Sequence, residues 1–285
     1  MSLAASPEVV ARLRAAGCVF ADEEAALLGE AATSPAQLEA MVARRVDGLP
    51  LEHVLGWAEF CGLRPAVEPG VFVPRRRTEA LVEEAARLAL RRPVGARGAV
   101  VVDLCCGSGA LGVALVTTLR AAGRPEGALH AGDVDPVAVR CARRNVEPLG
   151  GQVHSGDLFT SLPPSLAGRI DVLLANVPYV PTEAIALLPP EARRHEPRTA
   201  LDGGADGLDL LRRVASGAPA WLAPGGHLLV ECGQGQVPAA VQALTAAGLQ
   251  ARVLNTQSPV LVGTRAGGTP SLPSPGGRPS LPSLP

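Results

Sequence analysis

Strands and helices alternate along the chain from Thr78 onward, and this alternation restricts the fold more than any other feature of the sequence. Apolar, often β-branched runs predict strands at 99–104, 128–133, 151–154, 170–175, 227–232, 249–254 and 259–264. Helical patterns lie at 78–91, 110–122 and 136–147. This order predicts an α/β fold with a doubly wound, mostly parallel sheet of seven strands. The last two strands are too close together for a helical crossover, so we expect them to pair antiparallel.

The first part of the chain, residues 1–52, has a different pattern. A serine precedes a proline at Ser6 and again at Ser34, and this pair is typical of a helix start. Gly17 and Gly48 stand where helices would end. We therefore expect a small N-terminal helical domain.

Three further segments complete the predicted organisation. Residues 53–72 alternate like a β-hairpin linker with its turn near Gly62. Residues 73–265 hold the α/β domain. Residues 266–285 are rich in Pro, Ser and Gly, which predicts a disordered tail.

Composition excludes several classes of function. A formal net charge of −1 gives no support to nucleic-acid binding, which usually shows a strongly basic balance. The six cysteines form no C-x-x-C pair and have no histidine at zinc spacing, so we expect no metal site and a reducing compartment. No signal pattern opens the chain and no apolar run is long enough to span a membrane. The sequence therefore predicts a cytoplasmic protein with no membrane partner.

A glycine-containing loop follows the first predicted strand of the α/β domain. It carries the candidate cofactor-binding residues Asp103, Cys105, Cys106, Gly107, Ser108 and Gly109. Glycines allow positive φ angles and a close approach of the backbone to a ligand. Ligands of open α/β sheets bind at the carboxyl ends of strands. Read literally, 107–112 also matches the dinucleotide fingerprint G-x-G-x-x-G, so NAD stays open at this point.

Acidic residues at strand ends add to this candidate site. Asp133 ends the second strand and can accept hydrogen bonds from both ribose hydroxyls, whereas Asp135 precedes a proline and is better placed to cap the next helix. Asp157 and Leu158 follow the third strand, where we expect them beside the adenine. Asp103 can hold a cationic amino group and would repel a pyrophosphate.

The strand at 170–175 is followed by Asn176-Val177-Pro178-Tyr179, which contains the only tyrosine of the chain. The nitrogen of an amide or aromatic amine is a poor nucleophile because its lone pair is delocalised. The Asn176 side-chain oxygen and the Val177 carbonyl can accept both of its N–H groups and aim it at an electrophile. Pro178 keeps residue 177 extended, and Tyr179 can cover the planar group by stacking.

The chain resembles the HemK-type protein-(glutamine-N5) methyltransferases, and the resemblance covers roughly residues 50–264. Its motifs are Phe72-Val73-Pro74-Arg75 with Thr78-Glu79, Asn176–Tyr179, Glu196-Pro197-Arg198-Thr199-Ala200-Leu201 and Gly225–Glu231. The resemblance implies a class I S-adenosylmethionine-dependent fold. It also implies methyl transfer from S-adenosylmethionine to the glutamine of the Gly-Gly-Gln loop in peptide-chain release factors. The segment 1–52 would then dock the substrate, and 73–265 would be the catalytic domain.

Four departures from the family pattern are specific to this chain, one of which is an N-terminal helical region shorter than the family's substrate-docking domain. Cys105 stands where the family usually has a glycine, so we expect a backbone there that does not need positive φ. Val177 replaces the first proline of Asn-Pro-Pro-Tyr but keeps its carbonyl. Arg76 and Arg77 replace a more neutral or acidic pair.

Catalysis by positioning, without a strong base, is the expected mechanism. Three alternatives stay open: an amino methyltransferase acting on DNA adenine or another base, an NAD-dependent oxidoreductase, and a non-catalytic S-adenosylmethionine-binding protein. Asn176-x-Pro-Tyr alone also suits the first of these.

Overall fold

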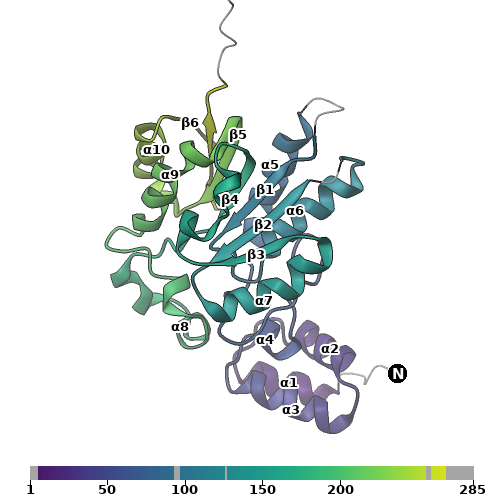
Figure 1. The fold of residues 1–285 in the computed structure, drawn as a ribbon. Helices are drawn as coiled ribbons and strands as arrows, with labels where there is room; N and C mark the ends of the chain where they lie inside the picture. The colour runs from purple at the N-terminus through teal and green to yellow at the C-terminus, as the bar shows by residue number, and fades with distance from the viewer. Residues whose placement is uncertain (1–5, 93–96, 126, 255–257, 268–285) are drawn as a thin grey trace, which may run out of the picture.

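A computed structural model describes residues 6–92, 97–125, 127–254 and 258–267 (Figure 1). The α-helices are α1 (Pro7–Ala15), α2 (Ala21–Ala31), α3 (Pro35–Val46), α4 (Leu51–Leu55), α5 (Glu79–Leu90), α6 (Ala110–Ala121), α7 (Pro136–Val146), α8 (Pro190–His195), α9 (Asp209–Trp221) and α10 (Val237–Ala246). The strands are β1 (Val100–Leu104), β2 (Ala128–Asp133), β3 (Gln152–Ser155), β4 (Ile170–Ala175), β5 (Leu222–Glu231), β6 (Leu249–Leu254) and β7 (Val260–Arg265). Most of the predicted tail lies outside the described residues.

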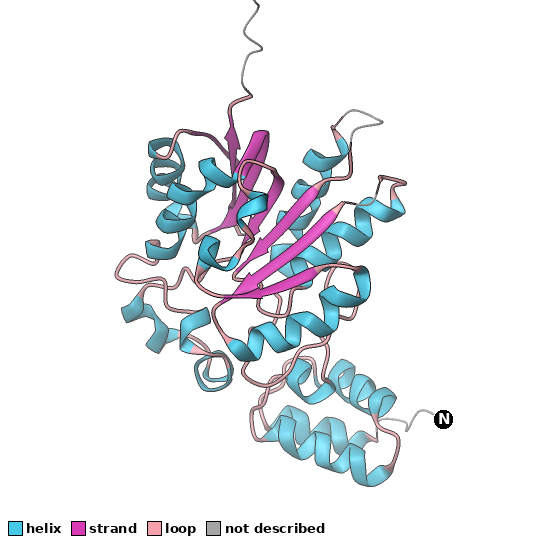
Figure 2. Ribbon diagram, viewed as in Figure 1, coloured by secondary structure: helices cyan, strands magenta, loops and turns pink. Residues whose placement is uncertain are grey.

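All seven strands form one sheet in the order β3-β2-β1-β4-β5-β7-β6 (Figure 2). β1 to β5 run parallel, while β7 pairs antiparallel with both β5 and β6. The predicted fold class and the antiparallel last pair are therefore confirmed. β5 begins at Leu222, five residues before the predicted 227, because Leu222 pairs with Ile170 across an irregularity in the register. The strand order reverses beside β1, where ligands of such sheets bind.

Helices cover both faces of the sheet, as Figures 1 and 2 show. Side chains alternate along β1, so Val101 packs under α5 and α6 whereas Val100 and Val102 pack on the side of α9 and α10. Both faces of β1 are thus buried, which explains its apolar run at 100–102. Among the described helices, none has the length and apolar character that crossing a membrane requires.

The helices α1 to α4 pack around their own core, centred on Leu13, Leu28 and Val42, at the end of the molecule near α7 (Figure 1). Ser6 accepts a hydrogen bond from the Val9 N–H at 3.3 Å, and Ser34 caps α3 in the same way. The predicted serine caps are therefore confirmed.

A short hairpin follows α4. Trp57 pairs with Ala66 and Phe60 with Leu63 in antiparallel bridges. Cys61 and Gly62 form the turn with φ of 50° and 71°, the left-handed pair that two-residue hairpin turns favour. The hairpin and its turn near Gly62 match the sequence expectation, while α4 itself continues to Leu55.

Candidate functional site

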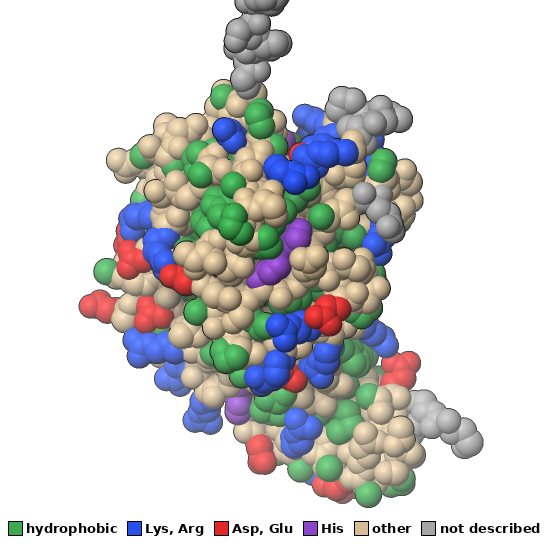
Figure 3. Space-filling view, viewed as in Figure 1, with side chains coloured by type: hydrophobic (Ala, Val, Ile, Leu, Met, Phe, Trp, Pro, Cys, Tyr) green, Lys and Arg blue, Asp and Glu red, His purple; other side chains and the backbone are tan. Residues whose placement is uncertain are grey.

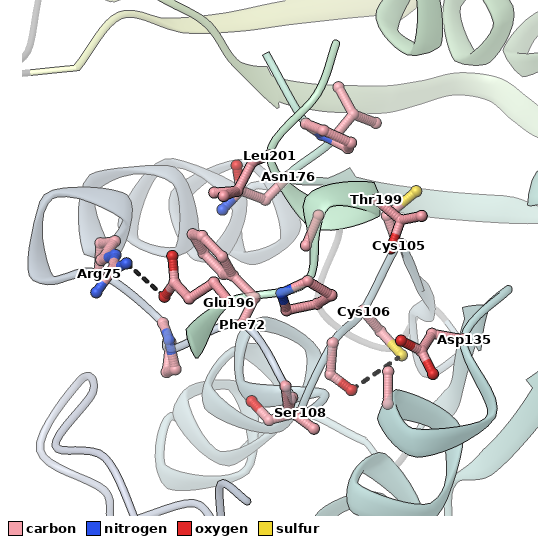
Figure 4. Close-up of a pocket in the computed structure, with 18 of the residues that line it drawn as sticks. Phe72, Arg75, Cys105, Cys106, Ser108, Asp135, Asn176, Glu196, Thr199 and Leu201 are labelled. Atoms are coloured by element: carbon pink, nitrogen blue, oxygen red, sulfur yellow. Dashed lines mark hydrogen bonds and ion pairs between the residues drawn. The ribbon is translucent and has the colours of Figure 1, made fainter. Parts of the chain in front are cut away.

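A pocket of about 460 Å³ lies at the carboxyl ends of β1, β2 and β4. It brings together most of the predicted site residues, namely Asp103, Cys105, Cys106, Gly107, Ser108, Asp133, Asn176, Val177, Pro178 and Tyr179. Parallel strands that end at one edge of a sheet explain why residues far apart in sequence meet here. Figure 4 shows the part of the wall to which Cys105, Cys106, Ser108 and Asn176 contribute.

The cofactor loop between β1 and α6 has a tightly curved backbone. Cys105, Gly107 and Gly109 have φ of 53°, 54° and 75°. The expectation that position 105 does not need positive φ is therefore wrong, and Cys105 adopts a conformation that costs an L-residue about 1–2 kcal/mol. Gly109 admits no side chain, because a Cβ there would lie 2.8 Å from Val146 of α7.

Asp133 holds the loop in place and faces the pocket. One carboxylate oxygen accepts the Gly107 N–H at 2.9 Å and the other accepts the Asp135 N–H at 2.9 Å. Burial raises the pKa of Asp133, and the two backbone donors oppose that shift. Asp135 itself caps α7 by accepting the Val137 N–H at 2.7 Å, as the sequence predicted.

Asp103 lies on the pocket floor and is 1% exposed. Its Oδ2 accepts the Gly112 N–H at 2.9 Å. A side chain at position 112 would crowd this approach, since a Cβ would lie 3.2 Å from the Asp103 Cβ and 3.3 Å from its Oδ2. Burial raises the pKa of Asp103 to about 7, so a positively charged ligand group would favour its ionised form.

The acceptor motif leaves two oxygens available. Within the described part of the chain, neither the Asn176 side chain nor the Val177 carbonyl has a hydrogen-bond partner. Val177 is 1% exposed, and its side chain packs in the core beside α9. The buried valine fixes the backbone of this segment, and both Asn176 and Val177 line the pocket.

Tyr179 is anchored through its hydroxyl, an arrangement that the sequence did not reveal. The hydroxyl lies 2.8 Å from Glu231 Oε1 and 3.0 Å from Arg77 Nη2. Glu231, at the end of β5, is fully buried and also accepts the Ser258 hydroxyl at 3.1 Å. Burial, together with the negative Glu231, raises the pKa of Tyr179, so the neutral phenol donates to the carboxylate. The ring is therefore held at one position in the pocket wall.

A glycine-rich turn supports the backbone of the same motif. Gly203 and Gly207 pack so closely on it that a Cβ would lie 2.7 Å from the Pro178 carbonyl and 2.3 Å from the Tyr179 carbonyl. Gln236 donates to the Tyr179 carbonyl at 2.8 Å. Sequence analysis did not single out these residues. Glycines clustered after the acceptor motif were the only local signal of a close backbone approach.

Glu196 connects two walls of the pocket. Its Oε1 accepts hydrogen bonds from Arg75 Nη2 at 2.5 Å and from the Val73 N–H at 3.3 Å (Figure 4). The segment 72–79 and the Glu-Pro loop, which the resemblance had singled out separately, are therefore in contact. Burial raises the pKa of Glu196, and Arg75 opposes that shift.

Three predicted cofactor residues do not line the pocket. Asp157 is exposed and pairs with Arg213 at 2.5 Å, and Leu158 packs in the core with φ of 49°. Gly109 begins α6 behind the loop. A direct contact of these three with a ligand stays a prediction.

Comparison with known proteins places these features in context. The family model "Methyltransferase small domain" matches residues 67–187. A release factor glutamine methyltransferase of Geobacter sulfurreducens is 43% identical over 69% of this chain and 65% of its own length. Proteins of the same name from Gloeobacter violaceus and Bradyrhizobium diazoefficiens are 41% and 38% identical, over 73% and 80% of this chain and 70% and 74% of their own lengths. The alignment thus spans about two thirds of the Geobacter relative.

A solved structure agrees on the fold. The catalytic domain of hMettl16, in complex with a 3'UTR hairpin, superposes with a TM-score of 0.53 at 14% identity, covering 85% of this chain and 82% of that one. At this identity the likeness concerns the fold alone, which is that of the class I S-adenosylmethionine-dependent methyltransferases.

Proposed function

The chain belongs to the release factor glutamine methyltransferase family, and we propose that it methylates the side-chain amide nitrogen (N5) of a glutamine in a peptide-chain release factor. The methyl donor is S-adenosylmethionine. One observation carries the proposal: Asn176 and Val177 line the pocket, and neither the Asn176 side chain nor the Val177 carbonyl has a hydrogen-bond partner in the described structure. A primary amide has two N–H donors, and the two acceptor oxygens could each accept one of them.

The residues of the cofactor loop suit S-adenosylmethionine better than a dinucleotide. The buried Asp103 and the half-buried Asp133 line one pocket, and a pyrophosphate beside them would be repelled. Asp103 would hold the ammonium of the amino-acid part, and Asp133 would accept the ribose hydroxyls. When bound, the sulfonium supplies an electrophilic methyl group.

The chain's own groups would act on the amide nitrogen by orientation. Asn176 Oδ1 and the Val177 carbonyl would each accept one N–H and place the nitrogen lone pair toward the methyl group. The same two oxygens stabilise the positive charge that develops on nitrogen during transfer. Tyr179, held by Glu231 and Arg77, would cover the plane of the amide and exclude water.

Methylation of a nucleic-acid base is the competing activity. The face in Figure 3 has acidic side chains interspersed among its basic ones. Many of the arginines are paired, as in the contacts of Arg144 with Glu68 at 2.9 Å and Arg213 with Asp157 at 2.5 Å. Such a surface gives little support to binding a polyphosphate backbone.

A cytoplasmic location is part of the same proposal, because release factors act there. All six cysteines are unpaired, which suits a reducing compartment.

Transfer of labelled methyl groups tests the proposal. The purified protein would be incubated with labelled S-adenosylmethionine and, in parallel, a release factor, a ribosomal protein and DNA. We expect label in the release factor alone. Label confined to DNA would overturn the glutamine assignment. Calorimetric titration with S-adenosylmethionine and with NAD is the companion test. If the protein bound NAD and did not bind S-adenosylmethionine, the assignment of S-adenosylmethionine as cofactor would be wrong.

A further inference from the structure

The carboxylate of Glu196 is a hydrogen-bond acceptor in the pocket wall that the proposed mechanism does not use. Glu196 is 6% exposed, its side chain only 1%, and its hydrogen bonds to Val73 and Arg75 both go to Oε1. Oε2 is completely buried and has no hydrogen-bond partner among the described residues. A buried polar atom of this kind costs about 1–3 kcal/mol unless something satisfies it.

The position of this oxygen suggests what satisfies it. Glu196 lines the same pocket as Asn176, and Figure 4 draws its carboxylate on the wall with Phe72 and Leu201, away from the cofactor loop. Arg75 contacts Oε1 at 2.5 Å and so fixes the orientation of the carboxylate.

The chemistry of a carboxylate oxygen defines its ligand. It accepts hydrogen bonds, and the amide of the methylated glutamine already has an acceptor for each of its two N–H groups in Asn176 and Val177. The remaining donors of a peptide substrate in this pocket are backbone N–H groups of the residues next to the glutamine.

We propose that Glu196 is a recognition residue for the protein substrate: when the pocket wall gives way to the bound peptide, Oε2, which has no exposed surface here, accepts a backbone N–H from the segment carrying the methylated glutamine. This rests on the proposed function and adds to it. The pocket then holds the glutamine side chain at Asn176 and Val177 and the peptide backbone at Glu196. A nucleobase offers no such backbone, so Glu196 favours a peptide over a base.

Glu196→Gln tests this role with little change in shape. Arg75 needs an acceptor, so it keeps the glutamine carbonyl at the position of Oε1 and leaves the NH₂ at the position of Oε2. A donor then faces the substrate's donor. Loss of a charge-assisted hydrogen bond predicts a KM for the release factor raised roughly tenfold or more. We expect kcat to change less than KM, and the calorimetric Kd for S-adenosylmethionine to stay within about twofold.

Glu183→Gln is the matched control, because it makes the same charge change at an exposed position outside the pocket. It should leave KM unchanged. A thermal melt of Glu196→Gln separates recognition from folding: a raised KM with an intact melt and intact cofactor affinity supports the proposal. Equal KM values for wild type and Glu196→Gln would overturn it while leaving the proposed function standing. Failure of the wild type to methylate any release factor would overturn both.

Discussion

Replacing Tyr179 with phenylalanine removes one oxygen atom and tests whether the anchored hydroxyl matters. The hydroxyl lies 2.8 Å from the buried Glu231 and 3.0 Å from Arg77. Losing a donor to a buried carboxylate costs about 1–3 kcal/mol. Glu231 keeps its contacts with Ser258 at 3.1 Å and with Arg77 at 3.5 Å. Because the carboxylate is still partly satisfied, we expect the free energy of unfolding to fall by about 1–2 kcal/mol, the lower half of this range.

The two consequences of this change can be measured separately. A domain of this size loses about 2–4 °C in Tm per kcal/mol, so the melting temperature should fall by roughly 2–8 °C. Freed from its anchor, the ring no longer fixes the amide, and kcat/KM for the release factor should fall about tenfold. The Kd for S-adenosylmethionine should stay within about twofold of the wild-type value, since the hydroxyl contacts no cofactor residue.

Ser258→Ala provides the control for this prediction, because it removes a different donor from the same carboxylate. It should lower Tm by a similar amount and leave kcat/KM near the wild-type value. If Tyr179→Phe kept both the wild-type Tm and the wild-type kcat/KM, the hydroxyl would have no anchoring role and the argument would fail. An equal loss of activity in Ser258→Ala would show that stability, not the position of the ring, sets the rate.

Three further predictions concern the pocket. Asn176→Ala removes one of the two amide acceptors, so kcat should fall by about 10²-fold or more while calorimetry finds an unchanged Kd for S-adenosylmethionine; full activity would show that the amide is held elsewhere. Cys105→Gly relieves a positive φ of 53° and should raise Tm by roughly 2–4 °C, and a lower Tm would show that the thiol's packing outweighs the strain. Asp103 has a pKa raised to about 7 and must lose its proton to bind a cation. The affinity for S-adenosylmethionine should therefore weaken as the pH falls below 7 in the wild type, and a titration of Asp103→Asn should lack that dependence; identical pH profiles would remove Asp103 from cofactor binding.

Local sequence patterns were sufficient to predict most of the fold. The strands β2, β4 and β6 have the predicted bounds, because short apolar runs and the turns that flank them are local signals. β5 is the exception. Its first residues are joined to the sheet by the pairing of Leu222 with Ile170, a contact that no pattern within 222–227 specifies.

The candidate site was predictable where residues follow the ends of strands. Asp103, Asp133 and Asn176 meet in one pocket because β1, β2 and β4 are neighbours with parallel ends. The side chains that hold this site could not be predicted in the same way. Tyr179 reaches across 102 residues to Arg77 and 52 residues to Glu231, and pairings this distant depend on the folded arrangement.

Two predictions made from the sequence, for Asp157 and for Cys105, differ from the structure because contacts with distant residues decide the outcome. Asp157 follows β3 as predicted, yet its carboxylate is turned outward to Arg213, a partner 56 residues away. The conformation of Cys105 likewise depends on the loop around it, where the N–H of Cys106 donates to the Gly132 carbonyl at 3.2 Å and that of Gly107 to Asp133. Residue type alone indicated a relaxed backbone there, and the surrounding hydrogen bonds produce a left-handed one.

Tandem mass spectrometry of a release factor incubated with this protein and S-adenosylmethionine tests the central claim most directly. The account predicts one added methyl group on the side-chain amide nitrogen of the glutamine in the Gly-Gly-Gln loop, formed about 10²-fold more slowly or slower still when Asn176→Ala replaces the wild type. A methyl group on any other atom, or a product that forms equally well with Asn176→Ala, would contradict the assignment of Asn176 and Val177 as the acceptors that orient the amide.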